Sequence, residues 1–255
     1  MRAAAQLKDK IARGEITTGA LAIDHLWPHL VEYLQRAGFD YLIIDREHGA
    51  HGDELVANVC AMGRMTDFAV LLRPPDCAYT TIRQSIDRGP CGFLLPSIES
   101  TADLDQVRDS IRMPPSGRRR PGGAGNYWVP DFDYDTFKRE VEDDFIVVPQ
   151  IEARRGLSCV DEIAAHEITT AIGIGPYDLS MELGVGNQMD HPRMQKAVET
   201  IRRAGEKAGK TMWRIGDGAK LAADGFHFLC IAEPMGVLQA ALAQKDQAAR
   251  NAQSG

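Results

Sequence analysis

The chain has 255 residues, of which 44% are hydrophobic and 25% are charged, as in an ordinary globular protein with a large core. Its formal net charge of -7 argues against nucleic-acid binding, which usually requires a basic surplus. No apolar run approaches the roughly 18 residues that a membrane span needs, and residues 1–16 are charged throughout, unlike a secretory signal. We therefore expect a cytoplasmic protein without nucleic-acid or membrane partners.

Apolar runs of strand length alternate along the chain with segments of helical periodicity. In chain order, we predict strands or helices at 17–23 (strand), 27–38 (helix), 41–45 (strand), 68–73 (strand), 79–89 (helix), 91–98 (strand), 100–113 (helix), 145–152 (strand), 169–175 (strand), 191–209 (helix), 211–216 (strand), 226–232 (strand) and 234–253 (helix). The strands are rich in Val, Ile, Leu and Phe and show little polar alternation. This pattern is typical of parallel strands that are buried on both faces.

About eight strands, each followed by a helix, suit the size of a (β/α)8 TIM barrel. The main alternative, a doubly wound open sheet, typically has fewer strands. It would also carry a GxGxxG phosphate-binding fingerprint after its first strand, and the sequence has none there. We predict an α/β fold with a single barrel domain over residues 1–255.

Residues 114–133 are too rich in Pro, Gly and Arg to form a regular element. Because they fall between the fourth and fifth strands, we expect them over one mouth of the barrel, as a lid or a poorly ordered connection. The arginines at 118–120 could meet an anionic substrate, and the favoured interpretation is a solvated or subunit-contacting cluster. The five cysteines lack metal-ligand spacing, and we expect them to be structural thiols in a reducing compartment.

Ionisable and amide side chains stand where several of the predicted strands end. Catalytic groups of a barrel come from the carboxyl ends of its strands, so these side chains would meet at one rim. Each alone could be an ordinary solvated or salt-bridged group, but their coincidence on one face is far more specific. They are Asp45, Glu47, His48, Arg73, Gln150, Glu152 and Asp178.

These residue types suit proton abstraction beside a carbonyl. Glu152 and Asp178 are two hard oxygen ligands that leave most of an octahedral shell open, which favours Mg²⁺ or Mn²⁺, or else Co²⁺, over a closed zinc site. An α-keto acid could fill two open positions, and the metal would act as a Lewis acid. Arg73 would face the developing enolate oxygen, and His48 has a suitable intrinsic pKa for proton transfer near neutral pH.

The segment GIGPYDLS provides backbone for ligand binding. Gly173 and Gly175 would let the chain approach a ligand closely. The backbone amides near Tyr177 and Asp178 lie at the start of a short predicted helix, where N–H groups favour the binding of a carboxylate. A simple strand-to-helix turn is the alternative interpretation of the same residues.

The chain resembles the HpcH/HpaI family of metal-dependent class II pyruvate aldolases over nearly its whole length. The motifs that carry the resemblance occur in the family's order: AGFDYLIIDREHG, LLRPP, IRQSIDRG, LLPSIES, PPSGRR, VPQIEA, IGIGPYDLSMELG and HPRMQKAVETI. The resemblance implies a (β/α)8 barrel that binds a divalent metal and pyruvate and makes or breaks 4-hydroxy-2-oxo acids. It also implies a homo-oligomer, commonly a hexamer, whose last helix packs on a neighbouring subunit.

The family's motifs imply a metal held by Glu152 and Asp178. They also imply that Gln150 and the backbone at Tyr177 contact the keto acid.

The same motifs imply that His48 is the proton acceptor. Asp87 would raise the basicity of His48, with Asp45 close by, and Arg73 would stabilise the transition state. Two further hypotheses stay open: a citrate-synthase-like condensation or malyl-thioester cleavage on the same fold, and a non-catalytic member that only binds a keto acid.

Some segments depart from the family's pattern and put the acceptor substrate in doubt. Arg46 replaces a common glycine, the first strand lacks a tryptophan that relatives often carry, and the last strand ends CIAEPMG. The segment HLWPH contains His25, Trp27 and His29, which could shape an aldehyde pocket.

Overall fold

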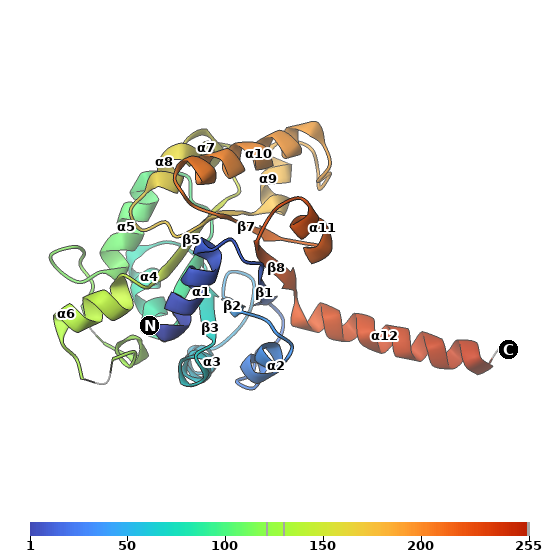
Figure 1. The fold of residues 1–255 in the computed structure, drawn as a ribbon, viewed down its shortest axis with the longest axis horizontal. Coiled ribbons are helices and arrows are strands. Elements are labelled where there is room, and N and C mark those ends of the chain that lie inside the picture. The colour runs from blue at the N-terminus through green and yellow to red at the C-terminus, as the bar shows by residue number, and fades with distance from the viewer. Residues whose placement is uncertain (121, 130, 254–255) are drawn as a thin grey trace.

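Eight parallel strands close into a barrel, and helices surround it (Figure 1). This computed structural model describes all residues except 121, 130, 254 and 255. Each strand pairs with its neighbours in chain order, and β1 pairs with β8 to close the sheet. The strands are β1 (Thr17–Ala22), β2 (Tyr41–Asp45), β3 (Ala69–Arg73), β4 (Gly92–Leu95), β5 (Ile146–Ile151), β6 (Ile172–Ile174), β7 (Met212–Ile215) and β8 (Phe228–Ala232). The predicted (β/α)8 barrel is confirmed, and every predicted strand overlaps an observed one.

Helix α1 (Arg2–Ala12) precedes β1, α12 (Pro234–Gln253) follows β8, and the other helices lie in the connections between consecutive strands. These other helices are α2 (Leu30–Arg36), α3 (Asp53–Thr66), α4 (Tyr79–Ile86), α5 (Thr101–Ile111), α6 (Tyr134–Phe137), α7 (Arg154–Ser158), α8 (Val160–Ala165), α9 (Pro176–Glu182), α10 (Pro192–Lys207) and α11 (Gly218–Ala223), with a 3₁₀ turn η1 (Ala124–Asn126) and a π-helical turn η2 (Lys138–Glu142). We did not predict α1, in which four of the eleven residues are charged. It forms because Ala3, Ala4 and Leu7 make a narrow buried stripe.

The barrel interior is filled by large side chains where the strands begin. Tyr41 is fully buried, and Trp213 Nε1 donates a 2.9 Å hydrogen bond to its hydroxyl oxygen. Phe228 meets the Tyr41 ring edge-on at 5.1 Å between centroids. Gly19 provides the space, because a Cβ at that position would lie 2.1 Å from the Tyr41 ring. The interior is therefore a packed core that supports the functional end of the strands.

The irregular 114–133 segment follows the carboxyl end of α5, on the side of the barrel where the strands begin. The expectation of a solvated or subunit-contacting arginine cluster is wrong for Arg119, which is fully buried in its own chain. Its guanidinium donates to Asp87 at 3.1 Å and to Asn126 at 3.3 Å, and lies 5.5 Å from the ring centroid of Phe137. This residue fastens the segment to the end of α4.

Helix α12 projects away from the barrel as a long arm (Figure 1). Its apolar side chains Val237, Leu238 and Leu242 are about half exposed. Within the residues that the structure describes, no helix combines the length and apolar character needed to span a bilayer.

Replacing Gly19 with Ala should destabilise the barrel, because the new methyl group would overlap the Tyr41 ring. Overpacking of this kind typically costs about 1–3 kcal/mol. Urea unfolding should show a lower free energy of unfolding than in the parent. Gly52→Ala is the control, since a Cβ there meets no atom within 4 Å and the φ is -70°. Equal losses in the two variants would contradict the packing of Gly19 against Tyr41.

Candidate active site

An ion pair joins the ends of two neighbouring strands. Asp45 ends β2, Arg73 ends β3, and the two residues are opposite each other in the sheet register. Arg73 donates from Nε to Asp45 Oδ1 at 2.9 Å and from Nη2 to Oδ2 at 2.6 Å, a two-pronged geometry that fixes the guanidinium plane. Burial acts to lower the pKa of Arg73, but the bonds to Asp45 and the nearby acids outweigh it, and the net pKa is raised. The predicted proximity of these residues is confirmed, with Asp45 fully buried.

Glu47 lies next to this ion pair, and His48 lies next to Glu47 and nearer to the solvent. Glu47 Oε2 lies 3.3 Å from Arg73 Nε and 3.7 Å from His48 Nε2. The His48 side chain is 59% exposed and therefore open to a substrate. Burial raises the pKa of Glu47, and the charges of Asp45 and Asp178 act in the same direction. We did not assign Glu47 a role from the sequence, although it lies between two residues that we did assign.

Glu152 is held by a residue that sequence reasoning missed. Its Oε1 accepts a hydrogen bond from the backbone N–H of Ser97 at 2.6 Å and another from the Ser97 hydroxyl at 3.1 Å. Ser97 follows β4 and has φ 53°, a left-handed conformation that is uncommon for a non-glycine residue. Ser97 lies in the motif LLPSIES, but the motif does not reveal the backbone conformation on which the contact with Glu152 depends.

The second carboxylate oxygen of Glu152 points to the start of α9. A Cβ on Gly175 would lie 2.2 Å from Glu152 Oε2, so only glycine fits at this position. Glu152 is buried, which raises its pKa, and the charges of Glu47 and Asp178 raise it further. Glu47, Glu152 and Asp178 thus form an acidic triad whose members repel one another: Glu47 follows β2, Glu152 follows β5, and Asp178 lies in the first turn of α9.

Glu152 and Asp178, the two predicted metal ligands, carry carboxylate oxygens of the type that a divalent cation prefers. Glu152 Oε2 receives no hydrogen bond from the described residues, and the mutual repulsion is the kind that a bound Mg²⁺ or Mn²⁺ relieves. In the part of the chain that the structure describes, no group of three or more His, Cys, Asp or Glu side chains is arranged to hold a metal ion. The arrangement therefore suits an open coordination shell with few protein ligands, completed by water or substrate.

Gln150 and Tyr177 flank the acidic triad. Gln150 is buried, and its Oε1 has no hydrogen-bond partner among the described residues, so its amide is free to meet a ligand. The Tyr177 side chain is 64% exposed, which leaves the backbone at the start of α9 as the part nearest the site. These positions agree with the predicted contacts to a keto acid, which themselves stay a prediction.

Asp87 does not meet His48 within one chain. It directly follows α4, which runs back from the end of β3 toward the start of β4, whereas His48 lies beyond the end of β2. In the described chain, the side-chain partners of Asp87 are Arg119 at 3.1 Å and Arg83 at 3.6 Å. The predicted effect of Asp87 on His48 therefore stays a prediction, and one that a single copy of the chain does not provide.

The cysteines are unsuited to nucleophilic catalysis. All five are free thiols, and Cys60, Cys91 and Cys230 are buried. Burial raises the pKa of Cys91 and of Cys230 to about 12, so these thiols stay protonated at neutral pH.

Comparison with known proteins identifies the relatives of this chain. A model of the HpcH/HpaI aldolase/citrate lyase family matches residues 25–233. The 2-keto-3-deoxy-L-rhamnonate aldolase of Shigella boydii is 29% identical over 79% of this chain and 77% of its own length.

Solved structures share the fold. An HpcH/HpaI aldolase from Desulfitobacterium hafniense superposes with a TM-score of 0.87 at 26% identity, covering 96% of both chains. The citrate synthase SbnG has a TM-score of 0.82 at 21% identity, covering 98% of this chain and 99% of its own, and this likeness concerns the fold alone.

Glu152→Gln should stabilise the metal-free protein at neutral pH. The folded-state pKa of Glu152 is raised above its ordinary 4.5, so ionised Glu152 costs folding free energy above that pKa and the cost disappears as the pH falls below it. Glutamine keeps an acceptor oxygen for Ser97 without the charge. In EDTA, urea unfolding between pH 4.5 and 8 should show a stability gain that is largest at the alkaline end.

The control for this measurement is Glu162→Gln, an exposed acid on α8, which should leave the pH dependence unchanged. A Glu152→Gln protein that is equally stable or less stable than the parent at pH 8 would contradict the repulsion within the acidic triad.

Proposed function

Because this chain belongs to the HpcH/HpaI aldolase/citrate lyase family, we propose that it is a metal-dependent aldolase, a carbon–carbon lyase that makes and cleaves 4-hydroxy-2-oxo acids. Its substrates are pyruvate, or the close analogue hydroxypyruvate, and an aldehyde. The observation that supports this most is the acidic triad beside the Asp45–Arg73 pair, with the exposed His48 at its edge.

Glu152 and Asp178 would hold Mg²⁺, Mn²⁺ or Co²⁺. When bound, this ion supplies Lewis-acid polarisation of the substrate carbonyl. Gln150 and the backbone at Tyr177 orient the keto acid. Because glycine has no side chain, Gly175 leaves room beside Glu152. Together they hold the substrate so that its C3 faces His48.

His48 moves the proton. In the condensation direction it takes a proton from C3 of the keto acid, and in cleavage it takes the proton of the 4-hydroxyl group. Arg73 places a permanent positive charge beside the oxygen on which negative charge develops. Asp45 holds the guanidinium in one plane, so this charge needs no reorganisation during the reaction.

The quaternary structure in this proposal is a homo-oligomer, with a hexamer favoured. The support is α12, whose apolar side chains Val237, Leu238 and Leu242 lie about half exposed on an arm that projects from its own barrel. Packing of α12 on a neighbouring subunit would bury them. The compartment that we propose is the cytoplasm, where five unpaired thiols are typical.

Purified protein loaded with Mg²⁺ or Mn²⁺ should release pyruvate from a 4-hydroxy-2-oxo acid, and EDTA should abolish the release. Glu152→Gln and Asp178→Asn should each lower kcat/KM by about 100-fold or more, since each removes a ligand charge. Coupled detection of pyruvate measures this, and 2-keto-3-deoxy-L-rhamnonate, the substrate in the name of the Shigella relative, is the first to assay. Glu162→Gln is the matched control and should retain full activity.

Activity that survives removal of the metal would exclude the proposed chemistry. Cleavage of a malyl-type thioester to glyoxylate and an acetyl thioester, without turnover of 4-hydroxy-2-oxo acids, would instead favour a thioester lyase. Metal and pyruvate binding without exchange of pyruvate C3 protons into D₂O would favour a non-catalytic binding protein.

Asp87 acts on His48, in this proposal, from a second copy of the chain. Oligomers assembled from equal amounts of His48→Ala and Asp87→Asn chains should therefore contain intact sites, and random mixing should restore about a quarter of the parent activity. Mixing His48→Ala with Glu152→Gln chains is the control, because those residues belong to one chain's site and no intact site can form. A mixture no more active than its separate components would show that Asp87 does not complete a neighbour's site.

A further inference from the structure

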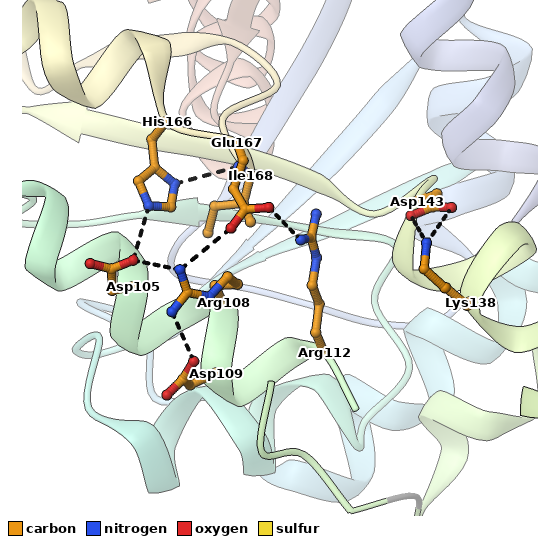
Figure 2. A network of polar contacts seen from close by, with 9 residues as sticks. All are labelled: Asp105, Arg108, Asp109, Arg112, Lys138, Asp143, His166, Glu167 and Ile168. Atoms are coloured by element: carbon orange, nitrogen blue, oxygen red, sulfur yellow. Dashed lines mark hydrogen bonds and ion pairs between the residues drawn. The ribbon is translucent and has the colours of Figure 1, made fainter. Parts of the chain in front are cut away.

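A second cavity lies at the opposite end of the barrel from the acidic triad. It has a volume of about 570 Å³ and is bounded by α1, the end of α5, η2 and the turn before β7. Figure 2 shows part of its surroundings, where Arg112 bonds Glu167 at 2.7 Å and Lys138 bonds Asp143 at 3.1 Å. The proposed aldolase chemistry uses none of these residues.

One end of the cavity contains a buried acceptor without a partner. Glu142 lines the cavity and is only 6% exposed. Its Oε1 accepts a hydrogen bond from the backbone N–H of Met113 at 2.6 Å, whereas its Oε2 has no partner among the described residues. An unpaired buried carboxylate oxygen is costly, so this position calls for a hydrogen-bond donor from outside the chain.

Two lysines line the cavity. These are Lys8 and Lys210, and burial lowers the pKa of Lys8, with the charge of Lys210 acting in the same direction and the charges of Asp144, Asp143 and Asp9 acting against it. Lys8 donates to the backbone oxygen of Asp143 at 2.7 Å, and Lys210 has no ion-pair partner in the part of the chain that the structure describes. Two such amines form a natural site for an anion.

The charges around Glu142 decide which donor suits it. The charged groups that act on Glu142 are Arg112, Arg119 and Lys138, all of them cations. A neutral hydroxyl group can donate to Glu142 Oε2 without adding a further charge beside these cations. Phe145 and Val147 line the same cavity and suit a short carbon chain.

We propose that this cavity is a binding site for a small hydroxylated carboxylate. The carboxylate would lie between Lys8 and Lys210, and a hydroxyl group would donate to Glu142 Oε2. The site is separate from the catalytic face and can be occupied whether or not the proposed aldolase function is correct.

Glycerate and propionate form a matched pair of probes, because they share the three-carbon carboxylate and differ in the two hydroxyl groups. Isothermal titration of the full-length chain should show glycerate binding at about 1 mM or tighter, and propionate binding at least about tenfold weaker. Lys210→Ala should weaken glycerate binding about tenfold. Glu142→Gln should remove most of the preference for glycerate over propionate. Lys207→Ala is the control, since this exposed lysine pairs with Asp161 outside the cavity.

The variant Glu152→Gln separates this site from the catalytic one, since glycerate binding to the cavity should be unchanged in it. Loss of binding in Glu152→Gln would assign glycerate to the catalytic site and overturn the proposal. So would equal affinity in Lys210→Ala and the parent, no binding at roughly 10 mM glycerate, or equal affinity for the two probes.

Discussion

Repulsion among Glu47, Glu152 and Asp178 is the constraint on which the functional end of this barrel depends. Glu47 and Glu152 follow β2 and β5, Asp178 lies in α9, and burial raises the pKa of both glutamates. A protein that holds carboxylates together in this way loses folding free energy unless a cation or a proton joins them. The neighbouring cation, Arg73, acts to lower the pKa of Glu47 from 3.3 Å, but burial outweighs it, and the two shortest bonds of Arg73 go to Asp45.

The barrel produces this arrangement from local rules. Parallel strands that are buried along their length must be apolar, so charged side chains can appear only where the strands end. Closure of the sheet then brings those ends to one rim. Gly175 and Ser97, which has a left-handed backbone conformation, fix the position of the Glu152 carboxylate. The glycine provides space for Oε2, and the serine donates two hydrogen bonds to Oε1. One oxygen is thereby fixed and the other left available, as a metal ligand requires.

Much of this could be predicted from the sequence, and the failures have physical causes. The strand runs and their polar ends predicted the barrel and brought Asp45, Arg73 and Glu152 to the correct face. Ser97 was missed because its contribution depends on a φ of 53°, which no residue pattern encodes. The burial of Arg119 was missed because an arginine-rich, glycine-rich segment looks like a solvated loop until its contact with Asp87 is seen. Helix α1 was missed because its apolar stripe is only three residues wide.

The central claim is that Glu152 and Asp178 share one divalent ion. Electron paramagnetic resonance of Mn²⁺ titrated into the protein tests it most directly, because it counts bound ions without requiring turnover. We expect one tightly bound Mn²⁺ per chain in the parent and in Glu162→Gln, and none in Glu152→Gln or Asp178→Asn. Undiminished Mn²⁺ binding in either of the last two variants would contradict the claim.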